Sequence, residues 1–100
     1  MDEPQDKALQ SVFRLRSSLL QAIEADQLIP WRHEPRVHEA IDLLRAARAD
    51  GPTLRRAEEI SCTLRMMNLF LREGRVNAFA SARLRLRSAA ARLSEPAASW

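Results

Sequence analysis

One stretch of the chain, ISCTLRMMNLFL at residues 60–71, constrains the fold more than any other. At a helical rotation of about 100° per residue, a first apolar stripe runs along Ala57, Ile60, Leu64, Met67 and Leu71. A second stripe, centred roughly 150° away, carries Cys62, Met66, Leu69 and Phe70. Because a helix that docks on one neighbour needs an apolar arc of only about 100°, this segment requires cover from two directions. The pattern therefore predicts the central helix of a small bundle.

The composition of the chain favours helices and a single domain. Leu and Ala dominate the 100 residues, Tyr is absent and only two residues are Gly, which leaves little material for strands. No apolar run is long enough to cross a bilayer, and the acidic, polar start MDEPQDK is unlike a signal peptide. We therefore expect a cytoplasmic protein with no membrane partner. Fifteen arginines against one lysine are typical of a GC-rich bacterial coding sequence.

Periodicity and helix-breaking residues predict four helices, at about 6–25, 35–49, 53–73 and 75–93. Pro35 fits the first turn of the second helix, where its missing N–H costs little. Gly51 is expected to close that helix, and Thr53 is the expected N-cap of the third. Residues 1–5 form a disordered lead-in, and residues 95–100 form a frayed tail. Short links make consecutive helices antiparallel, so the sequence predicts an all-α, up-and-down four-helix bundle made of two helical hairpins.

The segment DQLIPWRHE at residues 26–34 interrupts the helical pattern. Pro30 restricts the residue before it to extended geometry, which predicts a loop. Leu28, Ile29 and Trp31 are too apolar for a solvated loop, and we expect them to fold back over one end of the bundle. Trp31 is also a candidate contact for a partner, because exposed Trp is favoured at binding hot spots.

No set of residues indicates catalysis, a cofactor or a metal. Both glycines stop helices, so the chain has no glycine-rich phosphate loop. Cys62 is the only cysteine, which excludes an internal disulfide, and its mid-helix place on an apolar stripe favours a buried, inert thiol. Glu34, His38 and Asp42 share one helix face, but a single helix rarely supplies a closed metal site. The sequence therefore predicts a protein that is not an enzyme.

The last predicted helix is strongly basic. Five arginines and one glutamate give residues 74–100 a net charge of +4. Two arginines flank each edge of its apolar stripe: Arg83 and Arg87 on one edge, Arg85 and Arg92 on the other. Three interpretations remain open, namely pairing with acidic residues of other helices, phosphate contacts with nucleic acid, and contacts with an acidic protein partner.

The second stripe of residues 60–71 is the other candidate interaction surface. It can face the core, its own copy across a two-fold axis, or another protein, and the thin core of a chain this short favours a homodimer. We predict a regulatory or adaptor protein, of the anti-activator, inhibitor or secretion-chaperone type. It would bind another protein through Cys62, Met66, Leu69, Phe70 and Trp31. The alternative is a nucleic-acid-binding protein that uses the arginines of the last helix.

Overall fold

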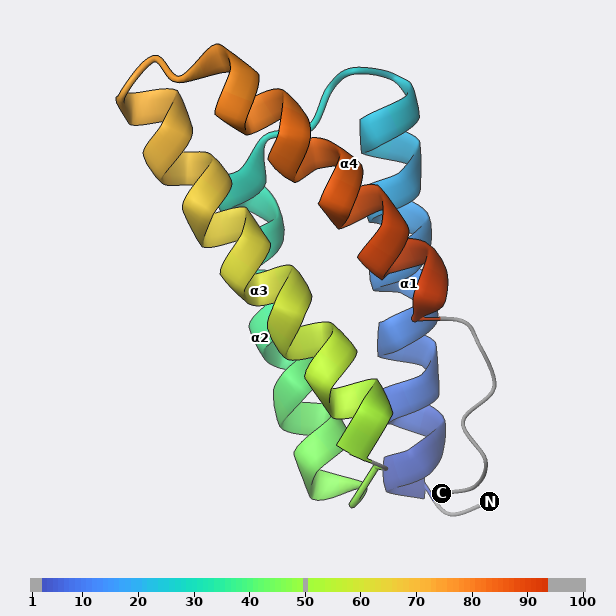
Figure 1. The fold of residues 1–100 in the computed structure, drawn as a ribbon. Helices are drawn as coiled ribbons and strands as arrows, with labels where there is room; N and C mark the ends of the chain where they lie inside the picture. Colours follow the sequence, from blue (N-terminus) through green and yellow to red (C-terminus); the bar gives the residue numbers. More distant parts are fainter. Residues whose placement is uncertain (1–2, 50, 94–100) are drawn as a thin grey trace.

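The computed structural model describes residues 3–49 and 51–93, and these residues form four α-helices and no strand. The helices are α1 (Glu3–Glu24), α2 (Pro30–Ala46), α3 (Gly51–Arg72) and α4 (Val76–Arg92). The backbone of each helix lies close to that of the next, and α4 returns to α1, whereas the backbones of the diagonal pairs lie further apart. This ring of neighbours is the arrangement of an up-and-down four-helix bundle (Figure 1). The prediction of an all-α fold is confirmed.

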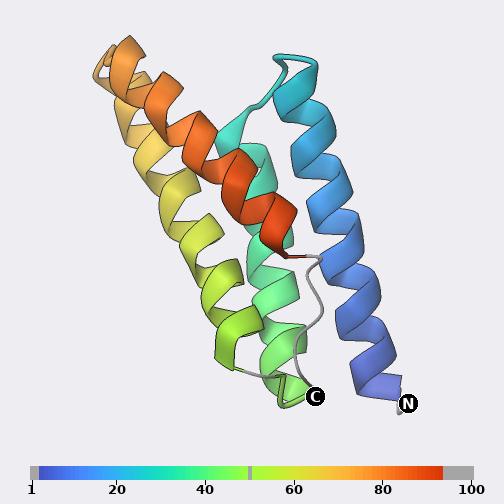
Figure 2. The ribbon, with the colours of Figure 1, turned by 45° about the vertical axis from the view of Figure 1, so that its right-hand side comes forward.

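The helix α3 lies between α2 and α4, as the width of its apolar surface predicts (Figures 1 and 2). Its side chains Ile60, Leu64 and Met67 are fully buried, and they share one core with residues from all four helices. Leu71, which the first stripe places beside them, is exposed instead. The reason is its position, because the last turn of α3 and the turn to α4 extend away from the rest of the bundle (Figures 1 and 2).

The helix α4 is shorter than the helix that it packs against. It has 17 residues against 22 in α3, and in both ribbon views it crosses obliquely towards α1 and ends part-way along it. Its buried positions are mostly small, namely Ala82, Ala89 and Ala90 around Leu86, which permits a close approach to α3. Val76 is exposed, because it begins α4 at the projecting turn.

Three of the four helices end with the same backbone motif. Asp26, Arg48 and Gly74 have positive φ angles of 55°, 55° and 68°. The residue after each one donates its N–H to a carbonyl five residues earlier, in the pairs Gln27–Ala22, Ala49–Leu44 and Arg75–Phe70. This is the Schellman motif. The predicted stop at Gly51 is therefore wrong: Arg48 closes α2, and Gly51 begins α3, whose second residue Pro52 needs no N–H partner.

Two more helices, α2 and α1, also begin earlier than the sequence predicts. Helix α2 begins at Pro30 rather than Pro35, because Pro30 takes a first-turn position and is buried there. Pro35 then lies inside the helix, where it removes one backbone hydrogen bond. Helix α1 begins at Glu3, with Pro4 in its first turn, so residues 3–5 of the predicted lead-in are helical.

The segment before α2 covers one end of the bundle only in part. Leu28 packs against the core and Ile29 is half-buried, but Trp31 lies in the first turn of α2 and is exposed. Thr53, the expected N-cap of the third helix, lies inside α3 and is buried. The predicted tail at residues 95–100 lies outside the described residues.

Candidate functional site

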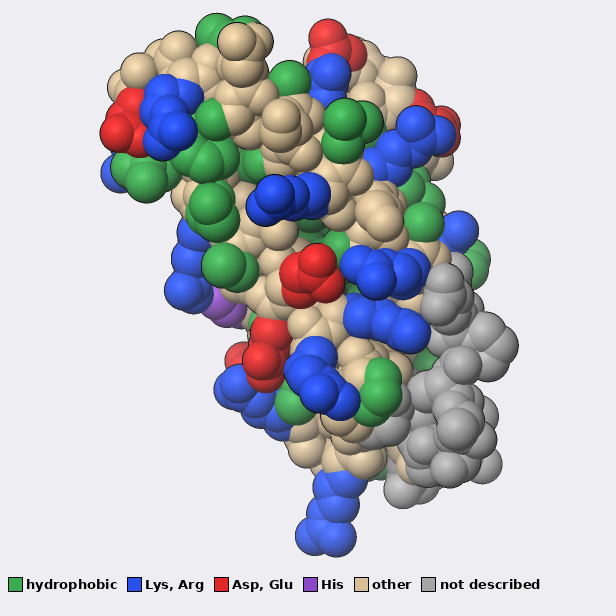
Figure 3. All heavy atoms as spheres, viewed as in Figure 1, with side chains coloured by type: hydrophobic (Ala, Val, Ile, Leu, Met, Phe, Trp, Pro, Cys, Tyr) green, Lys and Arg blue, Asp and Glu red, His purple; other side chains and the backbone are tan. Residues whose placement is uncertain are grey.

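The outward face of α3 carries a continuous row of exposed apolar side chains. Cys62 is exposed, Met66 is 44% exposed and Leu69 is 50% exposed. Their spacing of four and three residues aligns them along the side of α3 that lies between its contacts with α2 and α4. We call this row the α3 ridge. Figure 3 shows hydrophobic side chains gathered over the upper part of α3 and the adjoining part of α4.

The structure separates the members of the second predicted stripe. Phe70 is only 8% exposed, because its ring faces the small side chains Ala78 and Ala82 of α4. The guanidinium of Arg75 lies 4.8 Å from the centroid of that ring and covers it further. Phe70 therefore belongs to the core. Cys62, by contrast, faces outward midway between the two neighbouring helices, so the expectation of a buried thiol is wrong.

An open groove of about 190 Å³ runs beside the ridge, between α3 and α4. Its lining residues come from both helices: Thr63, Met66, Phe70, Ala78, Ser81, Ala82 and Arg85. The α4 side of the groove is formed by small side chains, so that Met66 stands beside free space. Arg85, which is exposed, contributes the one charged group of this lining. The groove offers room for an apolar side chain next to a cation.

The charged residues around the ridge differ in how they are paired. All three carboxylates of α3 and its following turn have an arginine partner, in the pairs Glu58–Arg45 at 3.4 Å, Glu59–Arg92 at 3.7 Å and Glu73–Arg75 at 3.9 Å. Arg65, Arg72 and Arg85 are exposed, and none of their guanidinium groups has an ion pair or hydrogen bond with another described residue. The sequence analysis missed Arg65 and Arg72 as site residues. Their spacing of seven along one edge of the second stripe is the signal that reveals them.

Trp31 is a separate exposed group at one end of the bundle. Its side chain is 60% exposed, and the guanidinium of Arg32 lies 5.2 Å from its ring centroid. Glu34, one turn further along α2, accepts a hydrogen bond from Asn68 of α3. Because α2 and α3 are antiparallel, Trp31 lies at the level of the last turn of α3. It remains a candidate contact for a partner, apart from the ridge.

The four arginines predicted to bind an anionic partner do not form one surface. Arg83 pairs with Asp26, and Arg92 pairs with Glu59. Arg85 and Arg87 make no ion pair with another described residue, but they line different grooves. Arg85 faces the α3 side of α4, whereas Arg87 lies beside Ile23 near the end of α1. The two free arginines therefore point to opposite sides of α4.

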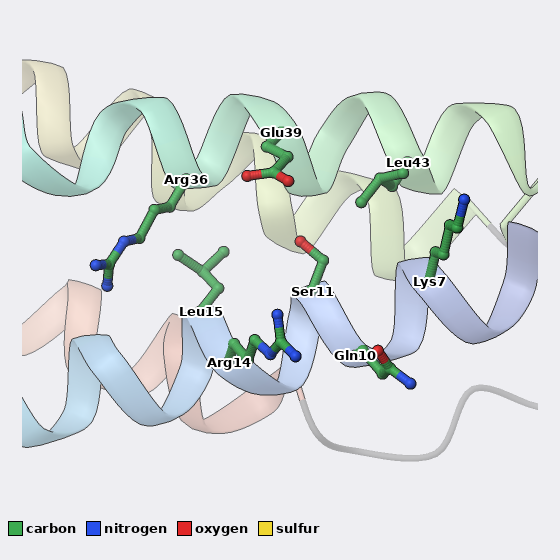
Figure 4. A pocket seen from close by; sticks show the side chains of 8 residues that line it. All are labelled: Lys7, Gln10, Ser11, Arg14, Leu15, Arg36, Glu39 and Leu43. Carbon is green, nitrogen blue, oxygen red and sulfur yellow. The ribbon is translucent and has the colours of Figure 1, made fainter.

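A larger groove, of about 600 Å³, lies between α1 and α2 (Figure 4). It is lined by Lys7, Gln10, Ser11, Arg14, Leu15, Arg36, Glu39 and Leu43. Arg36 donates a hydrogen bond of 2.8 Å to Oγ of Ser18, and Lys7 pairs with an acidic residue of its own helix at 3.2 Å. Ser11 and Glu39 share the middle of the groove in Figure 4 without a hydrogen bond between them. Within this groove no nucleophile is paired with a base.

His33 is a partly buried titratable group of α2. Partial burial lowers the pKa of its imidazole, and the nearby positive charge of Arg36 lowers the pKa further. Its Nδ1 atom is buried and has no hydrogen-bond partner in the described part of the chain. The neutral ring is therefore the form that the fold favours. Its lowered pKa makes the stability of the fold depend on pH.

The comparisons with known proteins add no family. No family model, no curated protein and no solved structure matches this chain. Among residues 3–49 and 51–93, no three His, Cys, Asp or Glu side chains gather as ligands for a metal ion. In the same ranges, no helix combines the length and hydropathy that crossing a membrane requires.

Proposed function

We propose that this chain is a non-catalytic regulatory or adaptor protein that acts by binding another protein. The observation that carries the proposal is the α3 ridge, in which Cys62, Met66 and Leu69 lie exposed in one row. Single exposed apolar residues are common on soluble proteins, but a contiguous row beside a groove is typical of an interaction site. The flexible thioether side chain of Met66 adapts its shape easily to a partner.

The buried part of α3 supports this choice of surface. Ile60, Leu64 and Met67 already fill the core, so the ridge residues are not needed to hold the four helices together. Covering them with a partner removes apolar surface from water, at roughly 25 cal/mol per Å². The proposed role is that of an anti-activator, an inhibitor or a secretion chaperone in a bacterial cytoplasm. A second copy of the chain, the homodimer that the sequence predicts, is the competing occupant of the ridge.

The second candidate is a nucleic-acid-binding protein. Arg85 and Arg87 support it, because both guanidinium groups are exposed and have no ion pair with another described residue. Their position on opposite sides of α4 weakens it, since phosphate contacts along one strand need cations on one face. The test of this second candidate is to measure the binding of duplex and single-stranded DNA at increasing salt concentration. Binding that weakens with salt, and is lost in Arg85→Glu/Arg87→Glu, would establish this function.

A capture experiment tests the leading proposal. The tagged chain is expressed in its source cells as the wild type, as Met66→Asp/Leu69→Asp, and as Leu84→Asp, which changes an exposed leucine on the outer side of α4. We expect a protein that co-purifies with the wild type and with Leu84→Asp, and that drops at least tenfold with the ridge variant. Equal recovery with all three chains, or no co-purifying protein, would contradict the proposal.

A further inference from the structure

On the α3–α4 hairpin the acidic side chains have ion-pair partners among the described residues, whereas several of the arginines do not. Its carboxylates, Glu58, Glu59 and Glu73, all pair with arginines of this chain. Helix α4 contributes no acidic residue between Val76 and Arg92. The arginines are in excess, and those nearest the ridge have no ion pair with another described residue. What the ridge presents to a partner is therefore an apolar row with a positive border.

The positive border lies on both sides of the apolar row. Arg65 and Arg72 stand on the edge of α3 that faces α2, one turn from Leu69 on either side of it along the helix. Arg85 stands on the other side, across the groove from Met66. A partner that covers the ridge meets cations along both of its margins. Carboxylates at those margins would gain attraction without displacing an existing ion pair.

The shape of the ridge fits a helix. The distance from Cys62 to Leu69 along α3 is about 10 Å, or two helical turns, and the apolar side chains are spaced by four and three residues. A helix laid beside α3 and α4 meets such a row with its own apolar face, at an axial distance of about 8–10 Å. The groove between Met66 and the small residues of α4 accepts one of its side chains.

The same border disfavours a second copy of this chain. A two-fold axis that packs the ridges antiparallel sets the edge with Arg65 and Arg72 against its own copy. A parallel arrangement sets that edge against Arg85 of the other copy. In either case unpaired cations face each other, which opposes association.

We infer that the occupant of the α3 ridge is an amphipathic helix of another protein, with apolar residues at helical spacing and Asp or Glu along both margins. This inference rests on the proposed function and names its partner class. The apolar face of that helix covers Cys62, Met66 and Leu69. Its carboxylates pair with Arg65 and Arg72 on one side and with Arg85 on the other.

Selection from a displayed library of random 16-residue peptides tests the inference without prior choice of a ligand. The wild-type chain is the bait, and Met66→Asp/Leu69→Asp is the counter-selection bait. We call the selected peptides that bind the wild-type chain but not the Met66→Asp/Leu69→Asp chain the ridge-dependent winners. We expect them to be net acidic, with Leu, Ile, Met or Phe at spacings of three and four residues. Raising the salt from low to high concentration should weaken their binding at least fivefold.

Two charge-reversal variants with the same change in net charge sharpen the test. Arg65→Glu/Arg85→Glu changes the border, and Arg14→Glu/Arg87→Glu changes exposed arginines elsewhere. The border variant should bind the winning peptides at least tenfold more weakly, and the control less than twofold more weakly. Milder Arg65→Gln/Arg85→Gln substitutions should give the same order, and thermal melts check that all variants fold.

The possible failures are distinguishable. Ridge-dependent winners that are neutral or basic, or that ignore the border variant, would overturn the inference and leave the proposed function standing. The absence of any ridge-dependent winner would remove both. A wild-type mass in solution of two chains, reduced to one chain in Met66→Asp/Leu69→Asp, would assign the ridge to a second copy and overturn the inference.

Discussion

The side-chain amide of Asn68 donates a hydrogen bond of 2.6 Å to Oε1 of Glu34, which ties α3 to the first turns of α2. The contact is partly buried and joins positions 34 residues apart. Replacing Asn68 with Ala leaves the carboxylate of Glu34 without this donor, and we expect a loss of about 1–2 kcal/mol in the free energy of unfolding. Urea unfolding measures the change. Gln10→Ala, at an exposed position of α1, should change stability by less than about 0.5 kcal/mol, and equal effects would refute this role.

Pro35 lies inside α2 and is exposed. It lacks the N–H that would bond to the carbonyl one turn earlier, and its ring crowds that carbonyl. Replacing Pro35 with Ala should therefore raise the free energy of unfolding by about 1–2 kcal/mol, after allowance for the greater freedom of the unfolded chain. Pro30→Ala is the matched control, because Pro30 is buried in the first turn and should lose stability instead. A stabilised Pro30→Ala with an unchanged Pro35→Ala would show that α2 begins later.

Arg48 closes α2 with a φ angle of 55°, a conformation that suits glycine. Replacing Arg48 with Gly should raise the free energy of unfolding by about 0.5–1 kcal/mol, because the left-handed conformation is strained for a residue with a Cβ atom. The reverse change, Gly74→Ala, should cost about 1 kcal/mol, since Gly74 has a φ angle of 68° although its surroundings are open. Thermal melts of both variants check the two signs, and the same sign for both would contradict the assigned helix ends.

The lowered pKa of His33 makes stability depend on pH. Above the ordinary value of 6.5, neither the folded nor the unfolded chain protonates this ring. As the pH falls below 6.5, the unfolded chain takes up a proton that the folded chain resists, so the free energy of unfolding should fall until the lowered pKa is reached. His33→Gln should flatten this part of the profile, measured by urea unfolding between pH 7.5 and about 5. A His33→Gln profile as steep as that of the wild type would contradict this role of His33.

The helical periodicity of the chain predicts the core of α3 and little of its surface. Ile60, Leu64 and Met67 recur at helical spacing, and all three are buried as predicted. Phe70 and Cys62 share the second stripe, yet one is buried and the other exposed. A helical wheel cannot distinguish the two, because the burial of a residue at the edge of a stripe depends on the side of α3 against which the next helix packs.

The first and last residues of the helices and the partners of the charged side chains could not be predicted from the sequence alone. Pro30 and Pro35 are both acceptable first-turn residues, and only the burial of Pro30 decides between them. Arg83 pairs with Asp26 across 57 positions of sequence, a relationship that no local pattern contains. For the same reason, the sequence left open whether the four arginines of the last helix pair within the chain or meet a partner. The structure pairs Arg83 and Arg92 with carboxylates of other segments and leaves Arg85 and Arg87 without an ion pair to another described residue.

The thiol of Cys62 reports directly on the central claim that the α3 ridge is covered by a partner. It is the only cysteine of the chain and lies exposed within the ridge. The measurement is the rate of its alkylation by a maleimide, compared between the dilute purified chain and intact source cells. Cys62→Ser/Gln21→Cys carries the control thiol at an exposed position of α1. The account predicts rapid labelling of the purified chain and labelling at least tenfold slower in cells, with the control thiol equally reactive in both. Equal rates for Cys62 in the two settings, or slow labelling of the dilute purified chain, would contradict it.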